Sequence, residues 1–342
     1  MSGAPVTLKT IAAELGVSVT TVARALKDGD RISAETVQRV RDAADRLGYV
    51  RNLEGAKLRT GRSLVIMAFL SFSTEEEVGD SGSVGLLNGI HQRLAGTDYA
   101  VRGVPVMPGQ AALDQLRAVV RGRLADGVIL DHIEAEDARI DFLLKAGLPF
   151  VTYGRTATPE QHPWFDIDNE QAAFQGTDAL IRAGYRRIAT IEGDRRFTFV
   201  QQRRQGHRRA LASHGISPDP ALEICSEIAA DTARRNAGLL LDQGADAFHC
   251  VNELAFLGAL AGVRDRLGAR ADRIGFALRA GTKLAEYVAT DSFVTYHERR
   301  QAGMRLADLV LRRIDGVPIS ACQELQETSL VAVKAHSGHG RD

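Results

Sequence analysis

The hydrophobic pattern of the chain changes near residue 62, and the two parts predict different kinds of structure. In the first part, apolar residues recur at the i, i+3, i+4 and i+7 positions of a helix: Leu8, Ile11, Ala12 and Leu15. Thr7 stands where a hydroxyl caps the start of that helix, and Gly16-Val17 predicts a tight turn after it. The pattern therefore predicts a short helix followed directly by a change of direction.

A second short helix follows the turn, and Ser18 is placed to cap it. Val22 and Leu26 share its inward face. The opposite face carries the residues that would meet base edges: Val19, Thr20 and Arg24. Two short helices joined by a tight turn are typical of a helix-turn-helix that binds DNA.

A third helix is predicted over residues 36–47, with Ser33 before it and Gly48 in a left-handed cap after it. Its apolar residues fall at helical spacing: Val37, Val40, Ala44 and Leu47. The alternative interpretation of these three helices is a small bundle with no DNA partner.

Beyond Ser63, short apolar runs alternate with longer helical stretches, which predicts an α/β body with parallel, buried strands. The predicted strands are Leu64–Leu70, Ala100–Val106, Gly127–Leu130, Phe150–Tyr153, Ile188–Ile191, Ala247–Val251, Ile274–Phe276 and Phe293–Tyr296. The predicted helices between them include Val84–Leu94, Leu113–Leu124, Gln171–Ala183, Gly206–His214 and Gln301–Ile314. So many strands predict two sheets joined by right-handed crossovers.

Charge is distributed unevenly, although the whole chain of 342 residues is neutral. Through Arg62 there are 11 Lys and Arg against 7 Asp and Glu, a net charge of +4, which leaves −4 for the remainder. A basic end favours phosphate binding. Three cysteines without close pairs predict a reducing compartment, and no apolar run predicts a signal peptide or membrane span. We therefore expect a cytoplasmic protein without a membrane partner.

The first part resembles the DNA-binding headpiece of the LacI/GalR family of bacterial transcription regulators. The resemblance lies in the segments TLKTIAAELGVS, TVARAL, ISAETVQRV, LGY and LRTGR. It implies DNA contacts by Thr7, Ser18, Val19, Thr20, Thr21, Arg24 and Lys27. This chain departs from the family at Ala23 and Lys27, where serine and asparagine are usual, and at Arg51, where proline is usual.

The segment Asn52–Leu58 corresponds to the family's hinge helix, which folds when two copies meet in the minor groove. Gly55-Ala56 stands where the family usually has Ala-Arg, and glycine weakens so short a helix. By the same resemblance, Leu58 is the apolar wedge that kinks the DNA. The alternative is an ordinary linker leucine.

The body resembles the family's pair of Rossmann-like lobes, which are similar to periplasmic sugar-binding proteins and hold a ligand between them. The segments that carry this resemblance are GVIL, LPFVTYGR, DIDN, GYRRIATI, RRQG and RIGF. The predicted fold class is therefore α/β, with an all-α helix-turn-helix headpiece joined by a hinge to a two-lobed periplasmic-binding-protein-like body. The predicted domains are residues 1–50 (headpiece), 51–62 (hinge) and 63–342 (ligand binding and dimerisation).

Open α/β sheets bind ligands at the carboxyl ends of their strands, so the residues that follow the predicted strands are candidates for ligand contacts. They are Ser71, Phe72, Asp131, His132, Arg155, Phe197, Phe199, Asn252 and Glu253. Arg203 is the strongest candidate, because the family's R-x-x-G arginine reaches the ligand and Arg203 begins that pattern here. For the others, a solvated loop position is an equal alternative.

The family's usual ligand-binding aspartate after G-F is Ala277 in this chain, which argues against a standard sugar ligand. Arg203, His132, Arg155 and Arg279 would supply donors to an anion. We therefore expect a sugar phosphate or a small organic acid, with a neutral sugar held through Asp131 and Asn252 as the alternative.

Enzymatic and metal motifs are weak. The segment GDSG at 79–82 lacks the β-barrel that serine-protease chemistry needs, and no phosphate-cradling or zinc-protease motif occurs. An acidic run contains Asp131, His132, Glu134, Glu136 and Asp137, but ligands of a tight metal site rarely come from one exposed run. We expect no catalytic residues, cofactor or metal.

These features predict a ligand-responsive repressor that binds a pseudopalindromic operator as a homodimer. The polar segment His336–Asp342 offers no counterpart of the family's tetramerisation helix. One alternative is a small-molecule-binding protein of the same fold without operator specificity, and another is a structural DNA-binding protein that needs no ligand.

Overall fold

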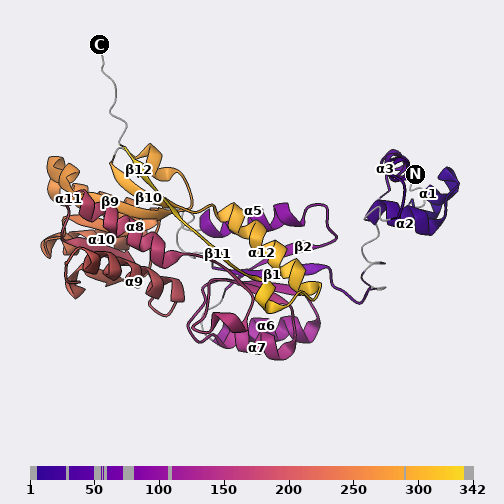
Figure 1. Cartoon of the computed structure of the whole chain (residues 1–342), viewed down its shortest axis with the longest axis horizontal. Helices are drawn as coiled ribbons and strands as arrows, with labels where there is room; N and C mark the ends of the chain where they lie inside the picture. Colours follow the sequence, from indigo (N-terminus) through magenta and orange to yellow (C-terminus); the bar gives the residue numbers. More distant parts are fainter. Residues whose placement is uncertain are drawn as a thin grey trace, which may run out of the picture. The chain divides into compact units, whose positions relative to one another are not determined.

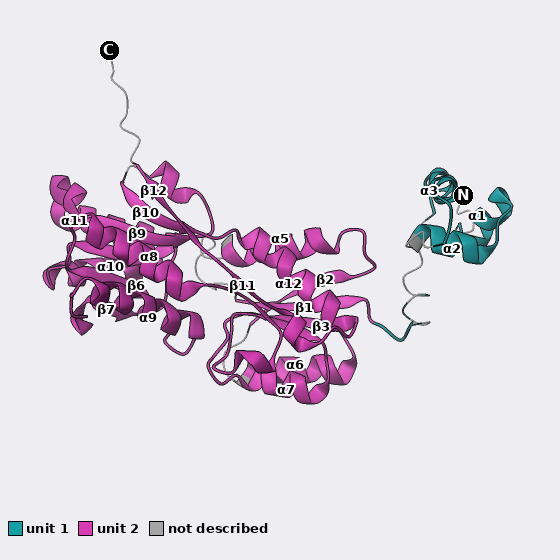
Figure 2. Cartoon of the chain, in the orientation of Figure 1, with its two compact units in different colours: residues 1–62 teal, residues 63–342 magenta. Residues whose placement is uncertain are grey.

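The computed structural model describes residues 6–27, 31–49, 55, 57, 60–71, 81–106, 110–288 and 290–334. The chain divides into two units, residues 1–62 and residues 63–342, which Figure 2 shows in different colours. Each unit has its own apolar core, and we describe the two separately.

The first unit is a three-helix headpiece composed of α1 (Leu8–Leu15), α2 (Val19–Lys27) and α3 (Ala34–Leu47). α1 follows its predicted cap, Thr7, and α3 ends at Leu47 as predicted but begins at Ala34, two residues before its predicted start. The Thr7 and Ser33 hydroxyls accept backbone N–H bonds at the starts of α1 and α3, and Gly16 and Gly48 end these helices with left-handed backbone. The buried residues of its core are Ile11, Ala12, Val22, Ala25, Val40, Ala43 and Ala44.

The second unit contains two six-stranded sheets (Figure 1). The first-lobe sheet has the order β11-β5-β4-β3-β1-β2 and its pairings are parallel. Its strands are β1 (Val65–Leu70), β2 (Ala100–Pro105), β3 (Gly127–Leu130), β4 (Phe150–Tyr153), β5 (Trp164–Ile167) and β11 (Gln323–Gln326). Its helices are α5 (Ser81–Leu94), α6 (Gln110–Gly122), α7 (Ala138–Ala146) and α12 (Arg299–Ile314).

Alternate residues of β1 enter opposite faces of this sheet, as the two-residue period of a strand requires. Ile66, Ala68 and Leu70 join one core with side chains of α5 and α12. Met67 and Phe69 join the other core, with side chains of α6 and α7. Both faces of β1 are therefore covered, which explains why its sequence is apolar throughout.

The second-lobe sheet has the order β12-β10-β9-β8-β6-β7, and only β12 runs antiparallel to its neighbour among the described pairings. Its strands are β6 (Ile188–Glu192), β7 (Glu223–Cys225), β8 (Ala247–Cys250), β9 (Gly275–Ala280), β10 (Ser292–Tyr296) and β12 (Ser329–Val333). Its helices are α8 (Asn169–Arg182), α9 (Thr198–Ser213), α10 (Ala230–Asp242) and α11 (Glu253–Leu267). The 3₁₀ helices of this unit are η2 (Pro159–Gln161), η3 (Pro220–Leu222), η4 (Gly268–Arg273), η5 (Leu284–Tyr287) and η6 (Ile319–Ala321).

The chain passes between the lobes three times: after β5, after β10 and after β11. These crossings bring the carboxyl ends of both sheets to the region between the lobes. The predicted α/β class and the two-sheet body are confirmed. Among the described helices, none is long and apolar enough to cross a membrane.

The prediction missed four strands and three helices. β7 is only three residues long, and β11 (QELQ) carries no apolar run that marks a buried strand. β5 and β12 were also missed, and so were α7, α10 and α11. The predicted start of α9 at Gly206 was wrong, because the helix begins two turns earlier, at Thr198.

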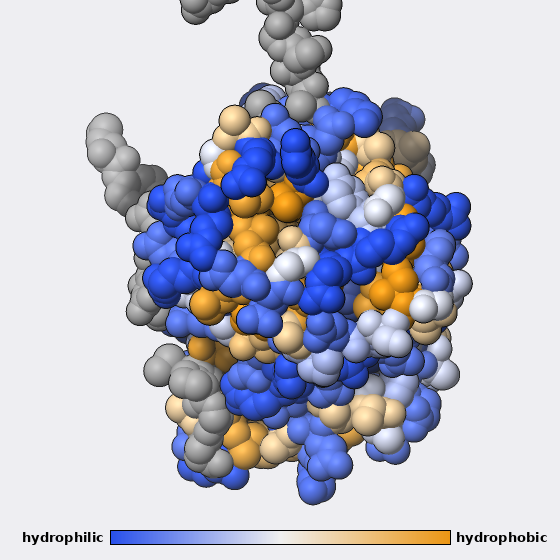
Figure 3. Space-filling model, turned by 90° about the vertical axis from the view of Figure 1, so that its left-hand side faces the viewer, coloured by the Kyte–Doolittle hydropathy of each residue, from blue (hydrophilic) through white to orange (hydrophobic). Residues whose placement is uncertain are grey.

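On the face of the molecule shown in Figure 3, hydrophilic surface predominates and the apolar areas are separate from one another. Large apolar side chains exposed in the second lobe include Leu239 and Tyr287. Isolated apolar side chains of this kind are ordinary on protein surfaces and indicate no binding site by themselves.

Candidate DNA-binding helix and ligand site

The outward face of α2 does not pack against the headpiece core. Val22 and Ala25 are fully buried, whereas Val19, Thr20 and Arg24 are exposed, with Val19 at 41%. Thr20 and Arg24 share one face of the helix because they are four positions apart, and Val19 is exposed beside them. An exposed aliphatic residue beside a hydroxyl and a guanidinium is suited to contact base edges in a major groove.

The hydroxyls of the headpiece have structural partners. Ser18 Oγ accepts the Thr21 N–H at 3.0 Å, and the two hydroxyls lie 2.8 Å apart. Thr7 makes the corresponding contacts with Thr10 at the start of α1. These caps hold the N-terminal ends of α1 and α2 in place. The Lys27 side chain and Leu58 lie outside the described residues.

Part of the predicted hinge is also outside the described residues. Within it, the Gly61 N–H donates to the Lys57 carbonyl at 2.8 Å, the i to i−4 spacing of a helix.

The two lobes make direct hydrogen bonds at one edge of the region between them. Both the N–H and the hydroxyl of Thr198 donate to the Ile133 carbonyl, at 3.0 and 3.1 Å. Glu134 forms an isolated antiparallel bridge with Phe197, and its carboxylate lies 3.4 Å from Arg196. The loop after β3 is thus joined to the N-terminal end of α9.

His132, Phe199 and Arg203 come together at this edge. The His132 ring lies edge-on to the Phe199 ring, with 5.4 Å between centroids, and the Arg203 guanidinium lies 5.0 Å from the centroid of the Phe199 ring. Arg203 is buried and makes a forked ion pair with Glu192, with N–O distances of 2.7 to 3.0 Å. Gly206 of the same motif lies against α8, where a side chain would overlap the Glu170 carbonyl.

Four other predicted ligand residues also have partners within the protein. Asp131 is buried and accepts the Ser71 N–H at 2.9 Å. Arg155 Nε donates to Asp166 at 2.8 Å. Asn252 caps α11 by accepting the Ala255 N–H at 2.9 Å. Phe72 lies outside the described residues.

The arginines among the predicted ligand residues differ in their partners within the protein. Arg203 and Arg155 each form an ion pair with a carboxylate, Glu192 and Asp166 respectively. Arg279 differs, because it is buried on β9 and its Nε has no partner among the described residues.

Further buried polar atoms without a partner in the described structure lie at the interlobe ends of strands and helices. They are Tyr153 Oη, Asn169 Oδ1 and both ring nitrogens of His297. A buried polar group without a hydrogen bond costs about 1–3 kcal/mol, so several together indicate a site that a polar ligand completes.

Electrostatic interactions connect these groups. Burial, together with the charges of Arg299 and Arg203, lowers the pKa of Arg279 to about 10. Burial likewise lowers the pKa of His297 well below its usual value, with the Arg279 charge as the next cause. Burial raises the pKa of the Asp166 carboxyl, against the attraction of Arg155. The region around Arg279 is thus buried and carries more positive than negative charge.

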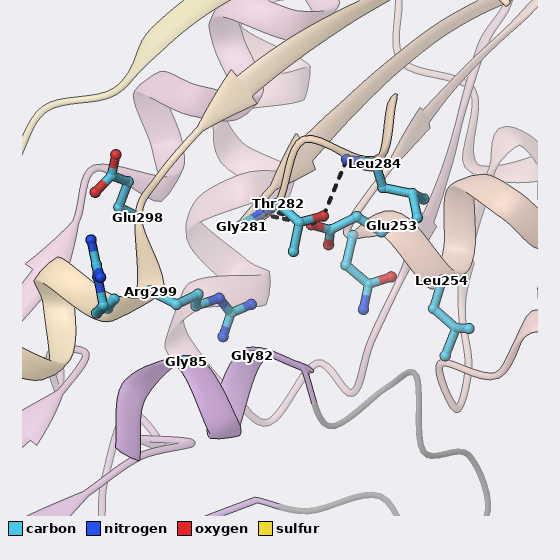
Figure 4. Close-up of a pocket in the computed structure, with 11 residues that line it drawn as sticks. Gly82, Gly85, Glu253, Leu254, Gly281, Thr282, Leu284, Glu298 and Arg299 are labelled. Atoms are coloured by element: carbon cyan, nitrogen blue, oxygen red, sulfur yellow. Dashed lines mark hydrogen bonds between the residues drawn. The ribbon is translucent and has the colours of Figure 1, made fainter. Parts of the chain in front are cut away.

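A pocket of about 430 Å³ opens beside this region (Figure 4). Both lobes line it, with Gly82 and Gly85 of α5 in the first lobe and Asn252, Gly281 and Thr282 in the second. Arg299, at the start of α12, reaches into it, as Figure 4 shows. The volume lies within the ~300–1,000 Å³ range of small-molecule sites.

Sequence reasoning missed Tyr153, Glu192, His297 and Arg299. Tyr153 and Glu192 are the last residues of β4 and β6, and His297 follows β10. The rule about carboxyl ends of strands could therefore have predicted all three. Arg299 begins a helix and falls outside that rule. Among the described residues, no group of three or more His, Cys, Asp or Glu side chains is placed to hold a metal ion.

Comparison with known families gives two matches along the chain. Residues 7–52 match the family described as "Bacterial regulatory proteins, lacI family". Residues 76–324 match "Periplasmic binding proteins and sugar binding domain of LacI family", which is more than half of the chain. The chain belongs to the LacI family. It is therefore a DNA-binding transcription regulator with a periplasmic-binding-protein-like body.

Individual LacI-family relatives match over nearly their whole length. The chain is 29% identical to the HTH-type transcriptional regulator AglR of Rhizobium meliloti (strain 1021), over 99% of this chain and 96% of the relative. It is 30% identical to the regulator RafR of Escherichia coli, over 92% of this chain and 94% of RafR.

Solved structures of LacI-family regulators share the fold. A complex of the transcriptional regulator CelR with cellobiose matches with a TM-score of 0.72 at 26% identity, over 96% of this chain and all of that chain. The Lac repressor dimer bound to operator and the anti-inducer ONPF matches with a TM-score of 0.73 over 97% of this chain and 99% of that one, and its 21% identity supports the fold alone.

Proposed function

We propose that this regulator is a repressor that binds a pseudopalindromic operator as a homodimer and changes its DNA affinity when a carbohydrate binds between the lobes. The observation that carries the proposal is the exposed face of α2, where Val19, Thr20 and Arg24 project from a capped helix whose other face is buried. A helix presented in this way serves recognition, because the headpiece core does not use those side chains.

The proposed DNA contacts divide into two groups. Val19, Thr20 and Arg24 contact bases, with Arg24 making a bidentate contact to guanine. The residues at helix ends contact phosphates and fix the register: Thr7, Ser18, Thr21 and Lys27. Leu58 inserts at the central base step when two hinge segments meet.

The proposed ligand site is the interlobe region around Tyr153, Asn169, Arg279 and His297. Its buried polar atoms lack partners among the described residues, and hydroxyl groups of a carbohydrate both donate and accept hydrogen bonds. The relative whose structure contains cellobiose supports a sugar as ligand class. Arg203 and Phe199 line the same region, held by Glu192.

Several further assignments belong to the same proposal. Residues 1–50, 51–62 and 63–342 act as headpiece, hinge and ligand-binding body. The protein works in the cytoplasm, has no enzymatic activity and needs no cofactor. Membership of the LacI family of bacterial regulatory proteins supports double-stranded DNA as the partner, and the homodimer is part of the same proposal.

Selection of DNA from a random pool tests the proposal. The full-length protein should enrich two inverted half-sites, and Arg24→Ala should relax the preference at one base pair in each half. A small-molecule-binding protein without operator specificity would enrich no sequence. A structural DNA-binding protein would bind its preferred sequence with the same affinity whether or not sugars are present.

A further inference from the structure

Two buried or half-buried arginines beside the interlobe pocket lack a carboxylate partner among the described residues. Arg155 and Arg203 form ion pairs with Asp166 and Glu192. In the described part of the chain, Arg279 and Arg299 form no ion pair, and the Nε atoms of both are buried without a hydrogen-bond partner. Arg279 is only 9% exposed, so solvent does not replace the missing anion there.

Three glycines leave room for the side chain of Arg299. A Cβ at Gly82 would lie 2.7 Å from Arg299 Nη1, and one at Gly281 would lie 2.9 Å from its Cγ. A Cβ at Gly85 would lie 2.9 Å from its Cβ. Glycines from both lobes therefore admit the guanidinium into the pocket, and Figure 4 shows it extending above Gly82.

Among the described residues, the carboxylates near this pocket are bonded to other groups or point away from Arg299. Glu253 Oε1 accepts both N–H groups of Gly281 and Thr282 and the Thr282 hydroxyl, at 2.8 to 2.9 Å. Figure 4 shows the exposed Glu298 carboxylate pointing away from the Arg299 guanidinium. Asp166 attracts Arg279, but its two oxygens are bonded to Arg155 on one side and to Ile167 and Asn169 on the other.

The positive charges of Arg279 and Arg299 also interact unfavourably with each other. Burial and the neighbouring charge of Arg299 both lower the pKa of Arg279. Keeping Arg279 protonated in the folded protein therefore costs free energy. Buried charges in proteins are normally paired. A neutral ligand would leave this cost in place, whereas an anion would remove it.

We propose that Arg279 and Arg299, together with the His297 ring, bind an acidic group, carboxylate or phosphate, of the carbohydrate ligand. This inference rests on the proposed function, because it places the acidic group within the same interlobe site. Guanidinium groups suit this task, since each offers two parallel N–H donors to a carboxylate or phosphate. The ligand class is thus an acidic sugar rather than a neutral one.

The test uses the full-length protein and matched probes: glucose, glucuronate, glucose 6-phosphate, and inorganic phosphate with ionic strength kept constant by sodium chloride. We expect at least one acidic probe to raise the melting temperature of the wild type more than glucose does. The larger of the glucuronate and glucose 6-phosphate shifts identifies carboxylate or phosphate as the preferred group. Equal shifts for glucose and the acidic sugars, or no shift with any acidic probe, would overturn the inference.

Two variants and one control locate the effect. Arg279→Gln and Arg299→Gln should each weaken binding of the acidic probe by about ten- to a hundredfold, the loss of a charged hydrogen bond. Arg195→Gln removes an exposed arginine that does not line this pocket and should bind the probe like the wild type. Unchanged affinity for the acidic probe in both Arg279→Gln and Arg299→Gln would overturn the inference. If Arg279→Gln fails to fold, the half-buried Arg299 still provides the test.

Measuring operator affinity with each probe distinguishes a failure of this inference from a failure of the proposed function. A neutral sugar that changes operator affinity, with no effect of the acidic probes, would overturn the inference and leave the ligand-responsive regulator intact. Acidic probes that bind but leave operator affinity unchanged would contradict the proposed function instead.

Discussion

The headpiece and the interlobe region use polar side chains in opposite ways. On α2, Arg24 is exposed and the headpiece core does not involve it. Between the lobes, Arg203 is 4% exposed and makes a forked ion pair with Glu192. The first side chain is available to a partner, whereas the second already has its partner inside the fold.

This difference determines what a substitution costs. Removing an exposed side chain changes binding and leaves the free energy of unfolding nearly unchanged. Removing one member of a buried pair leaves its partner charged and without compensation, so the fold itself loses stability. The substitutions below test this division of roles, from the largest expected effect to the smallest.

Arg203→Gln should have the largest effect. We expect it to lower the free energy of unfolding of the body by about 3–5 kcal/mol, because Glu192 is left buried without its cation. Urea denaturation measures this loss. Arg208→Gln is the control, since Arg208 is exposed and Glu223 keeps Arg204 as its partner. Similar losses of unfolding free energy in both variants would contradict the claim that a buried ion pair contributes more to stability than an exposed one.

Acid should destabilise the body through His207 and His249, whose Nδ1 atoms lie 2.9 and 3.0 Å from the Thr177 hydroxyl. Burial lowers the pKa of His207 to about 4 and that of His249 to about 3. The unfolded chain, with histidine pKa near 6.5, therefore binds more protons. The contribution of the two neutral histidines to the free energy of unfolding is fully present above pH 6.5. It is lost as the pH falls toward 4, by up to ~1.4 kcal/mol per histidine and pH unit.

Denaturation of the full chain between pH 7 and pH 5 measures this effect. Residues 1–62 contain no histidine, so the protection of headpiece amides from hydrogen exchange, after correction for the intrinsic exchange rate at each pH, should change little over the same range. The exposed His91 provides a control as His91→Gln, which should keep the wild-type pH dependence. A body whose stability is constant from pH 7 to pH 5 would contradict the prediction.

Arg24→Ala should act on DNA binding alone. We expect operator affinity to fall by about 1–3 kcal/mol, with affinity for random DNA and the free energy of unfolding nearly unchanged. Fluorescence anisotropy at one fixed salt concentration measures both affinities. Equal losses on operator and random DNA would show that Arg24 is a phosphate contact.

Ser18→Ala should have the smallest effect. It removes the hydroxyl that accepts the Thr21 N–H and should destabilise the headpiece by ~1 kcal/mol. Hydrogen exchange of the α2 amides measures this loss. Ser18→Asn retains a capping oxygen and should stay within a few tenths of a kcal/mol of the wild type. Equal protection of α2 in the Ala variant and the wild type would show that the cap contributes nothing.

The same contrast explains how much of the molecule was predictable. Headpiece signals are local: Thr7, Ser33 and Gly48 cap helices a few residues away, so the sequence predicted the caps and the buried face correctly. Buried parallel strands such as β3 and β4 were predicted with their observed bounds, because their apolar runs are uninterrupted. The polar strand β11 was missed because its place in the first sheet depends on pairing with β5, more than 150 residues earlier.

The ligand site was predicted less completely, for a physical reason. The rule about strand ends proposed Arg155, Asn252 and Asp131 as ligand contacts, but it does not say which carboxylate each arginine meets. The pairing of Arg203 with Glu192 requires α9 to pack beside the end of β6, which is a property of tertiary structure. The balance of charges between the lobes therefore required the three-dimensional structure, and so did the observation that buried Arg279 Nε has no partner among the described residues.

The most direct test of the account is the operator affinity of the full-length protein with and without a bound carbohydrate. Fluorescence anisotropy on the selected operator and on a random duplex of equal length, at one salt concentration, gives both values. The account predicts that the carbohydrate changes operator affinity by about five- to 150-fold, the usual range of coupling between two sites, and leaves random-duplex affinity unchanged. Saturating carbohydrate with identical operator affinity would contradict it.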